Sequence, residues 1–216
     1  MAKPVLGYLD FRVLAEPIRY LLYYKNVQFE DKRYQRDGTW DKEKSTFGFD
    51  FPSLPYYIDG KVKLTQSITI LRYLAKKFDL EGTCEMERVR VALAEQQIWD
   101  FYMAFVHAVV KPGTEKREEY LKKVPDSFKL LEAFIGSHKY MVGDNLTYVD
   151  FMGYELLDFN ILLSRDILDG FPILKAYHER IRNLPELQDY FNSSTYKKWP
   201  IFKPPAAWGS SGEMPQ

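Results

Sequence analysis

The chain has 216 residues, and its 30 lysines and arginines balance its 30 aspartates and glutamates, so the formal net charge is zero. This balance offers no electrostatic footprint for a nucleic acid or a membrane surface. No apolar run approaches the roughly 20 residues of a membrane span, no secretory signal follows Met1, and the single cysteine, Cys84, excludes an intramolecular disulfide. We therefore expect a cytosolic protein, with a substantial core because 46% of the residues are hydrophobic.

The first third of the chain alternates strand and helix signals. Val5–Leu9 reads as a strand, residues 14–25 as a helix with Pro17 tolerated in its first turn, and residues 28–33 as a second strand. This order predicts a right-handed βαβ unit in which the helix packs on the sheet.

The most informative run lies between Phe51 and Ser67. The Leu54-Pro55 bond is of the only type that becomes cis at low cost, and Asp59-Gly60 predicts a two-residue hairpin turn. Gln66 and Ser67 then open a helix, whose N-terminus offers unpaired N–H groups to a carboxylate. We predict a pocket for an extended, peptide-like ligand with an acidic end.

Strand signals vanish after residue 81. A long helix carries apolar residues on one face, a second helix begins near Glu115 and must bend or break at Pro125, and Thr147 with Asp150 fits a capping box. The apolar positions of the long helix are Val89, Ala92, Trp99, Met103, Val106 and Val110. The fold prediction is therefore α/β plus all-α, with an N-terminal thioredoxin-like domain (βαβ-ββα, residues 1–81, without Cys-x-x-Cys) and a C-terminal helical bundle (residues 82–216) that ends in an extended tail.

A thioredoxin-like domain without cysteines, joined to a helical domain, resembles the cytosolic glutathione transferases. Short motifs in a specific order make the chain most similar to the mu class: Leu6-Gly-Tyr8, Arg12, Glu16-Pro17-Ile18-Arg19, Trp40 with Lys44, Phe51-Pro52, Leu54-Pro55-Tyr56, Leu64-Thr65-Gln66-Ser67, Arg72-Tyr73, Asp150-Phe151 and Phe171-Pro172. The resemblance implies a homodimeric detoxification enzyme that transfers the thiolate of glutathione to hydrophobic electrophiles. It also implies that glutathione is a co-substrate, that no cofactor is permanently bound, and that no metal takes part.

In this resemblance Tyr8 is the catalytic residue, although without it a core tyrosine would be the ordinary reading. A free thiol with a pKa of about 8.5 is only about 3% thiolate at neutral pH, and lowering that pKa by about 2 units takes about 2.7 kcal/mol. A neutral phenol that donates its O–H to the thiolate can supply part of this energy.

The resemblance also assigns the remaining site residues. The residues implied in glutathione binding are Leu14, Trp40, Lys44, Ser53, Leu54, Pro55, Gln66, Ser67 and Asp100, the last from the second subunit. Asp100 has an alternative as an ordinary polar residue of the long helix. The hydrophobic-substrate residues are Leu9, Met103, Ala104, Val110 and Phe202, and the dimer residues are Phe51 and Arg72.

Four positions depart from the class. Leu9 replaces a tryptophan, Val13 a glycine, Ser53 an asparagine and Val110 a tyrosine. The loss of the indole N–H at Leu9 predicts weaker glutathione binding, and Val110 makes the second-substrate site more apolar. Two other functions stay open: a weakly catalytic or non-catalytic carrier of hydrophobic ligands, and a glutathione-dependent isomerase.

Overall fold

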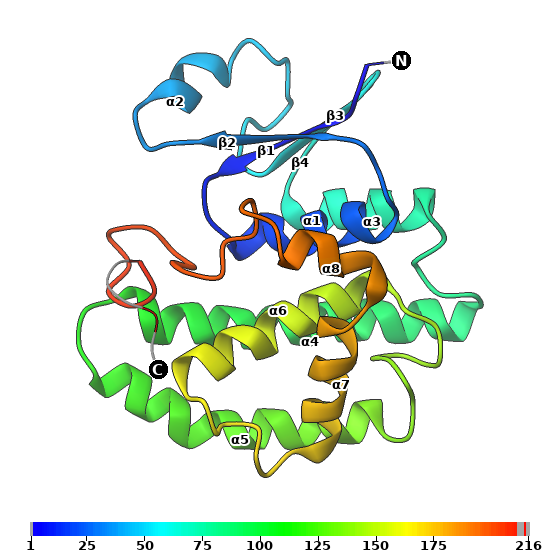
Figure 1. Ribbon diagram of the computed structural model, residues 1–216, viewed down its shortest axis with the longest axis vertical. Helices are drawn as coiled ribbons and strands as arrows, with labels where there is room; N and C mark the ends of the chain where they lie inside the picture. Colours follow the sequence, from blue (N-terminus) through cyan, green and yellow to red (C-terminus); the bar gives the residue numbers. More distant parts are fainter. Residues whose placement is uncertain (1, 211–213, 215–216) are drawn as a thin grey trace.

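The computed structural model describes residues 2–210 and 214, and it shows a small sheet-containing part stacked on a larger group of helices (Figure 1). The upper part contains β1 (Val5–Leu9), a 3₁₀ turn (Val13–Ala15), α1 (Glu16–Tyr24), β2 (Glu30–Tyr34), α2 (Thr39–Glu43), β3 (Tyr56–Asp59), β4 (Val62–Thr65) and α3 (Ser67–Lys77). The lower part contains α4 (Glu85–Val110), α5 (Glu115–Ile135), α6 (Tyr148–Leu163), α7 (Pro172–Arg182) and α8 (Pro185–Phe191).

The strands form one mixed sheet in the order β2-β1-β3-β4. β1 pairs in parallel with β2 and antiparallel with β3, which confirms the thioredoxin-like βαβ-ββα order. The hairpin turn lies one residue later than predicted, because Asp59 pairs with Val62 and leaves Gly60 and Lys61 in the turn. Gly60, at φ 61°, occupies the first central position, where a type II′ turn requires a positive φ.

A large hydrophobic cluster contains residues from both parts. Leu6, Ile18 and Leu74 of the upper part belong to the same buried cluster as Phe151 and Leu157 of α6. Helices α1 and α3 therefore lie between the sheet and the helical bundle, as Figure 1 shows. The regular elements of the upper part end at Lys77 and α4 begins at Glu85, so a boundary at residue 81 stays a prediction.

The long helix α4 buries a different face from the one that the apolar pattern marks. Val91, Ile98 and Phe105 are buried within the chain, whereas Val89 of the marked face is 55% exposed. Only the first part of the marked face, at Val89 and Ala92, is exposed, because Val106 and Val110 at its other end are half-buried against a hydrophobic cluster.

Helix α5 runs without a break from Glu115–Ile135, with Pro125 in its interior, so the break offered as one outcome at this proline does not occur. Proline removes one backbone N–H, and the buried side chains of Val124, Phe128 and Leu131 hold the helix on both sides of it. The capping box of α6 is confirmed: Asp150 accepts a hydrogen bond of 2.7 Å from the Thr147 N–H, and the Thr147 side chain accepts one from the backbone N–H of Asp150.

Candidate active site

Tyr8 lies near the end of β1 and is almost fully buried, with its ring edge-on to Phe11 at a centroid distance of 5.4 Å. Burial raises the pKa of the Tyr8 phenol to about 12, against the opposing effects of a hydrogen bond from the Leu14 backbone and the positive charges of Arg19 and Arg36. The phenol therefore keeps its proton at neutral pH and can act as a hydrogen-bond donor.

The backbone next to Leu54 offers hydrogen-bonding groups to an extended ligand. The Leu54-Pro55 bond is cis, as predicted, and the pairing of β3 with β1 ends at Tyr56. In the part of the chain that the structure describes, neither the N–H nor the C=O of Leu54 has a hydrogen-bond partner. A short peptide can add to such a free segment as an extra strand.

Gln66 and Ser67 lie where α3 begins, as predicted. Gln66 has φ 72° and ψ 113°, a backbone conformation that stores about 1–3 kcal/mol in a non-glycine residue and is concentrated at functional sites. Ser67 is buried and is the first residue of α3. The unpaired N–H groups of this helix end attract a carboxylate.

The short helix α2 lies on the far side of the sheet from α1 (Figure 1). Trp40 belongs to α2, and Lys44 directly follows its last residue. The Trp40 ring stacks on Tyr56 at 5.7 Å, which fixes its position. Lys44 forms an exposed ion pair of 2.7 Å with Asp41. Exposed pairs contribute at most about 1 kcal/mol, so Lys44 can exchange this partner for a ligand carboxylate.

An apolar cluster surrounds Tyr8. Leu9, Val110 and Phe202 belong to it, together with Leu14 and Leu54. Met103 and Ala104 are not among its residues, and Ala104 instead lines a groove between α4 and α5. Residues of the cluster that the sequence analysis did not name for this site include Phe11, Phe105, Val109, Phe159, Ile201 and Trp208. The concentration of aromatic residues in the tail was the available signal for Trp208.

The C-terminal segment covers one side of this cluster. The N–H groups of Ala207 and Trp208 donate to the carbonyls of Val110 and Val109, and Arg36 donates to the Pro204 carbonyl at 2.7 Å. The tail thereby connects the end of α4 with the loop after β2 and forms a wall beside Tyr8.

The remaining predicted residues lie farther from this cluster. Phe51 is 75% exposed, and Asp100 is exposed on α4. Arg72 of α3 donates to the buried carboxylate of Glu95 on α4 at 2.7 Å, which connects the two parts of the chain. Among residues 2–210 and 214, no group of three His, Cys, Asp or Glu side chains could hold a metal ion.

Comparison with known proteins decides the family. Residues 4–76 match the model of the glutathione S-transferase N-terminal domain, and residues 99–194 match that of the C-terminal domain. The chain belongs to the glutathione S-transferase family. It is a transferase that uses glutathione as its co-substrate.

Relatives match this glutathione S-transferase over nearly its full length. A glutathione S-transferase of the mite Dermatophagoides pteronyssinus is 40% identical over 98% of this chain and 99% of its own. Glutathione S-transferase Mu 1 of Oryctolagus cuniculus is 43% identical over 94% of this chain and 97% of its own. The crystal structure of the glutathione S-transferase Blo t 8 aligns with a TM-score of 0.87 at 35% identity, over 95% of this chain and 99% of that one.

The described part of this glutathione S-transferase contains no helix that is long and apolar enough to cross a membrane.

Proposed function

We propose that this glutathione S-transferase is a cytoplasmic homodimer of the mu class that conjugates glutathione to hydrophobic electrophiles. The 43% identity to a relative named Mu 1 supports the class, and mite glutathione S-transferases match at a similar level. The observation that carries the proposal is the position of a buried, protonated Tyr8 within the apolar cluster that also includes Leu54.

The proposed chemistry depends on Tyr8. The tripeptide thiol gives its proton to solvent, and the Tyr8 hydroxyl donates a hydrogen bond to the thiolate that remains. This thiolate attacks the electrophilic carbon of the second substrate, a new C–S bond forms, and the leaving group departs. A donor of this kind in a site shielded from water stabilises the anion more than it would in bulk solvent.

The remaining site residues bind the three parts of glutathione. The γ-glutamyl carboxylate lies at the N-terminus of α3 with Gln66 and Ser67, and Asp100 of the second subunit pairs with its ammonium group. The cysteinyl unit pairs with the Leu54 backbone, beside Ser53 and Pro55. The glycyl carboxylate binds Trp40 and Lys44, while Leu14 lies beside the sulfur.

The second substrate binds against the apolar cluster around Tyr8. Leu9, Val110 and Phe202 line this site, and no tyrosine hydroxyl stands at Val110 to assist an electrophile. Met103 and Ala104, which the resemblance also implies here, lie outside this cluster, and Ala104 faces the groove between α4 and α5. We expect a preference for apolar substrates with a good leaving group over substrates that need protonation of an oxygen.

The test is turnover of an activated chloro-nitro aromatic compound with glutathione. The Tyr8→Phe variant is expected to lose about 100-fold or more in kcat/KM, the usual effect of removing one donor to a developing anion. Tyr177→Phe is the matched control, because its hydroxyl donates to the Asp150 carbonyl in the helical core. Equal activity of Tyr8→Phe and the control would contradict the assignment of Tyr8.

A glutathione-dependent isomerase is the second candidate. The rat hPGDS structure complexed with a quinoline aligns with a TM-score of 0.76 at 26% identity, over 88% of this chain and 96% of that one. An isomerase would turn over its substrate without consuming glutathione. A carrier of hydrophobic ligands would bind them with no turnover, so measuring substrate turnover together with glutathione consumption separates all three functions.

A further inference from the structure

The loop that follows Tyr8 contains a valine in an unfavourable backbone conformation. Val13 has φ 65° and is 7% exposed. A β-branched residue with positive φ is a genuine outlier, because its side chain collides with the backbone in the left-handed region. Such a conformation persists only where the surrounding contacts hold it, so the contacts of this loop identify what holds Val13.

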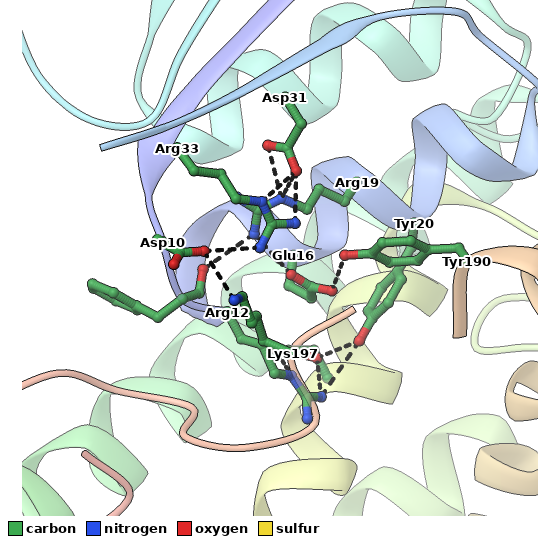
Figure 2. A network of polar contacts seen from close by, with 11 residues as sticks. Asp10, Arg12, Glu16, Arg19, Tyr20, Asp31, Arg33, Tyr190 and Lys197 are labelled. Carbon is green, nitrogen blue, oxygen red and sulfur yellow. Dashed lines mark hydrogen bonds and ion pairs between the residues drawn. The ribbon is translucent and has the colours of Figure 1, made fainter. Parts of the chain in front are cut away.

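Two neighbours on the N-terminal side of the loop are held by the sheet-containing part and by the C-terminal segment. The Phe11 carbonyl accepts a hydrogen bond of 3.1 Å from buried Arg19. The Asp10 carboxylate lies 3.4 Å from Arg33 of β2 and 3.5 Å from Lys197 of the C-terminal segment. Figure 2 shows Asp10 together with Arg19, Arg33 and Lys197, which come from separate elements.

Arg12, immediately before Val13, is instead held by the helical bundle. Its side chain is fully buried, and it donates to Glu155 of α6 from Nε at 3.1 Å and from Nη2 at 2.6 Å. The same Nη2 donates to Asp158 at 2.6 Å. A guanidinium held by two carboxylates in a fixed fork is a rigid anchor.

Leu14, the residue after Val13, lies next to Tyr8. Leu14 packs in the same apolar cluster as Tyr8 and Val13. Its backbone N–H also lies near enough to the Tyr8 phenol to oppose the rise of that pKa. The conformation at Val13 therefore sets where the Leu14 N–H lies relative to the Tyr8 hydroxyl.

We infer that Arg12 is a positioning residue for Tyr8: its buried contacts with Glu155 and Asp158 hold Val13 in the left-handed conformation and thereby keep Leu14 against the Tyr8 hydroxyl. Helix α6 thus helps to position Tyr8 of the sheet-containing part through Arg12, without contacting the glutathione thiol itself. If the anchor is loosened, Val13 relaxes toward negative φ, Leu14 moves, and Tyr8 stabilises the thiolate less well. This inference rests on the proposed role of Tyr8.

The test is an Arg12→Lys variant, which keeps the positive charge and loses the planar guanidinium that bonds to Glu155 and Asp158 together. The ultraviolet absorbance of the thiolate, followed against pH with saturating glutathione, gives the pKa of the bound thiol. We expect this pKa to rise and kcat/KM to fall about 10- to 100-fold, the usual effect of a small misplacement at a reacting group. The KM for glutathione should change much less, because the Arg12 side chain is fully buried against α6.

The double variant with Val13→Gly distinguishes positioning from general stability. Glycine adopts positive φ without strain, so it needs no anchor. Arg12→Lys should therefore lower kcat/KM far less in the Val13→Gly background than in the parent chain. Independent sites would give additive effects, so an equal fold loss of kcat/KM from Arg12→Lys in the two backgrounds would overturn the inference. An unchanged thiol pKa in Arg12→Lys would overturn it too.

Two further variants keep the test decisive. Asp158→Asn removes a carboxylate that is 18% exposed, so it replaces Arg12→Lys if the latter does not fold, with the same expected results. Tyr148→Phe removes a hydroxyl that donates to buried Glu95 at 2.7 Å, away from the loop, and it should lower the melting temperature without changing the thiol pKa. If the parent protein itself shows no bound thiolate, the proposed function fails. If the parent shows the thiolate and the variants have the same thiol pKa and kcat/KM as the parent, this inference alone fails.

Discussion

The Tyr8 phenol is protected from ionisation by its surroundings. Burial raises its pKa to about 12, so the phenol is neutral at every pH below that value and remains a donor. The thiol of bound glutathione is then the group that titrates. We expect kcat/KM to rise with pH through a single ionisation and to stay level up to pH about 10. A pH–rate profile measures this, and a falling limb below pH 10 would show that Tyr8 loses its proton.

Leu9 offers no side-chain hydrogen-bond donor at a position where the resemblance to the mu class implies an indole. A charge-assisted hydrogen bond contributes about 1.5–3 kcal/mol, so Leu9→Trp should tighten glutathione binding by about 10- to 100-fold. Isothermal titration with glutathione measures the change. Leu9→Phe is the matched control, since it adds an aromatic ring without an N–H. Equal gains from both variants would show that the ring, rather than the donor, is responsible.

At the scale of the element, the start of α6 depends on one buried carboxylate. Asp150 accepts hydrogen bonds from the Thr147 N–H and hydroxyl and from the Met141 N–H, at 2.7, 3.0 and 2.7 Å. Asp150→Ala should lower the free energy of unfolding by about 3–5 kcal/mol, because it removes the cap and leaves a buried N–H without a partner. Asp150→Asn keeps one acceptor oxygen, so it should lower the free energy of unfolding by about half as much as Asp150→Ala. Urea denaturation measures both values, and equal losses would contradict this reading.

At the scale of the whole molecule, the exposed apolar residues mark a surface that the chain leaves uncovered. Phe51 lies on the sheet-containing part, and Met86, Val89 and Leu93 lie on α4 with Leu130 on α5. Large apolar side chains that a chain leaves exposed are candidates for an interface. The proposed homodimer covers this surface with a second copy by two-fold symmetry, so that Phe51 of each copy meets the helices of the other.

Phe51→Ala should therefore weaken the dimer without weakening the fold. Burying one such ring contributes about 1.5–3 kcal/mol, and a symmetric dimer buries two. Sedimentation equilibrium measures dissociation, and Ile173→Ala, a change at a partly exposed residue outside this surface, is the control. A dimer constant unchanged by Phe51→Ala would refute the proposed interface.

Several features were predictable because they depend on residues close together in the chain. The capping box spans Thr147 to Asp150, and the start of α3 at Ser67 follows from its immediate neighbours. The hairpin was placed one residue early, since the register of a strand pair depends on which side chains the sheet buries. The order of motifs indicated the family, which the two domain matches confirm.

The amino-acid sequence by itself determined the βαβ-ββα order, the helical second part and the chemistry that Tyr8 can supply. Tertiary structure alone decided which face of α4 is buried, where the tail lies, and that Arg12 meets Glu155 across 143 positions of the chain. The physical reason is range: caps and turns form between neighbouring residues, whereas a buried ion pair or a helix face is selected only when distant segments pack together. The strain at Val13 belongs to the second group, because the contacts around it come from separate parts of the molecule.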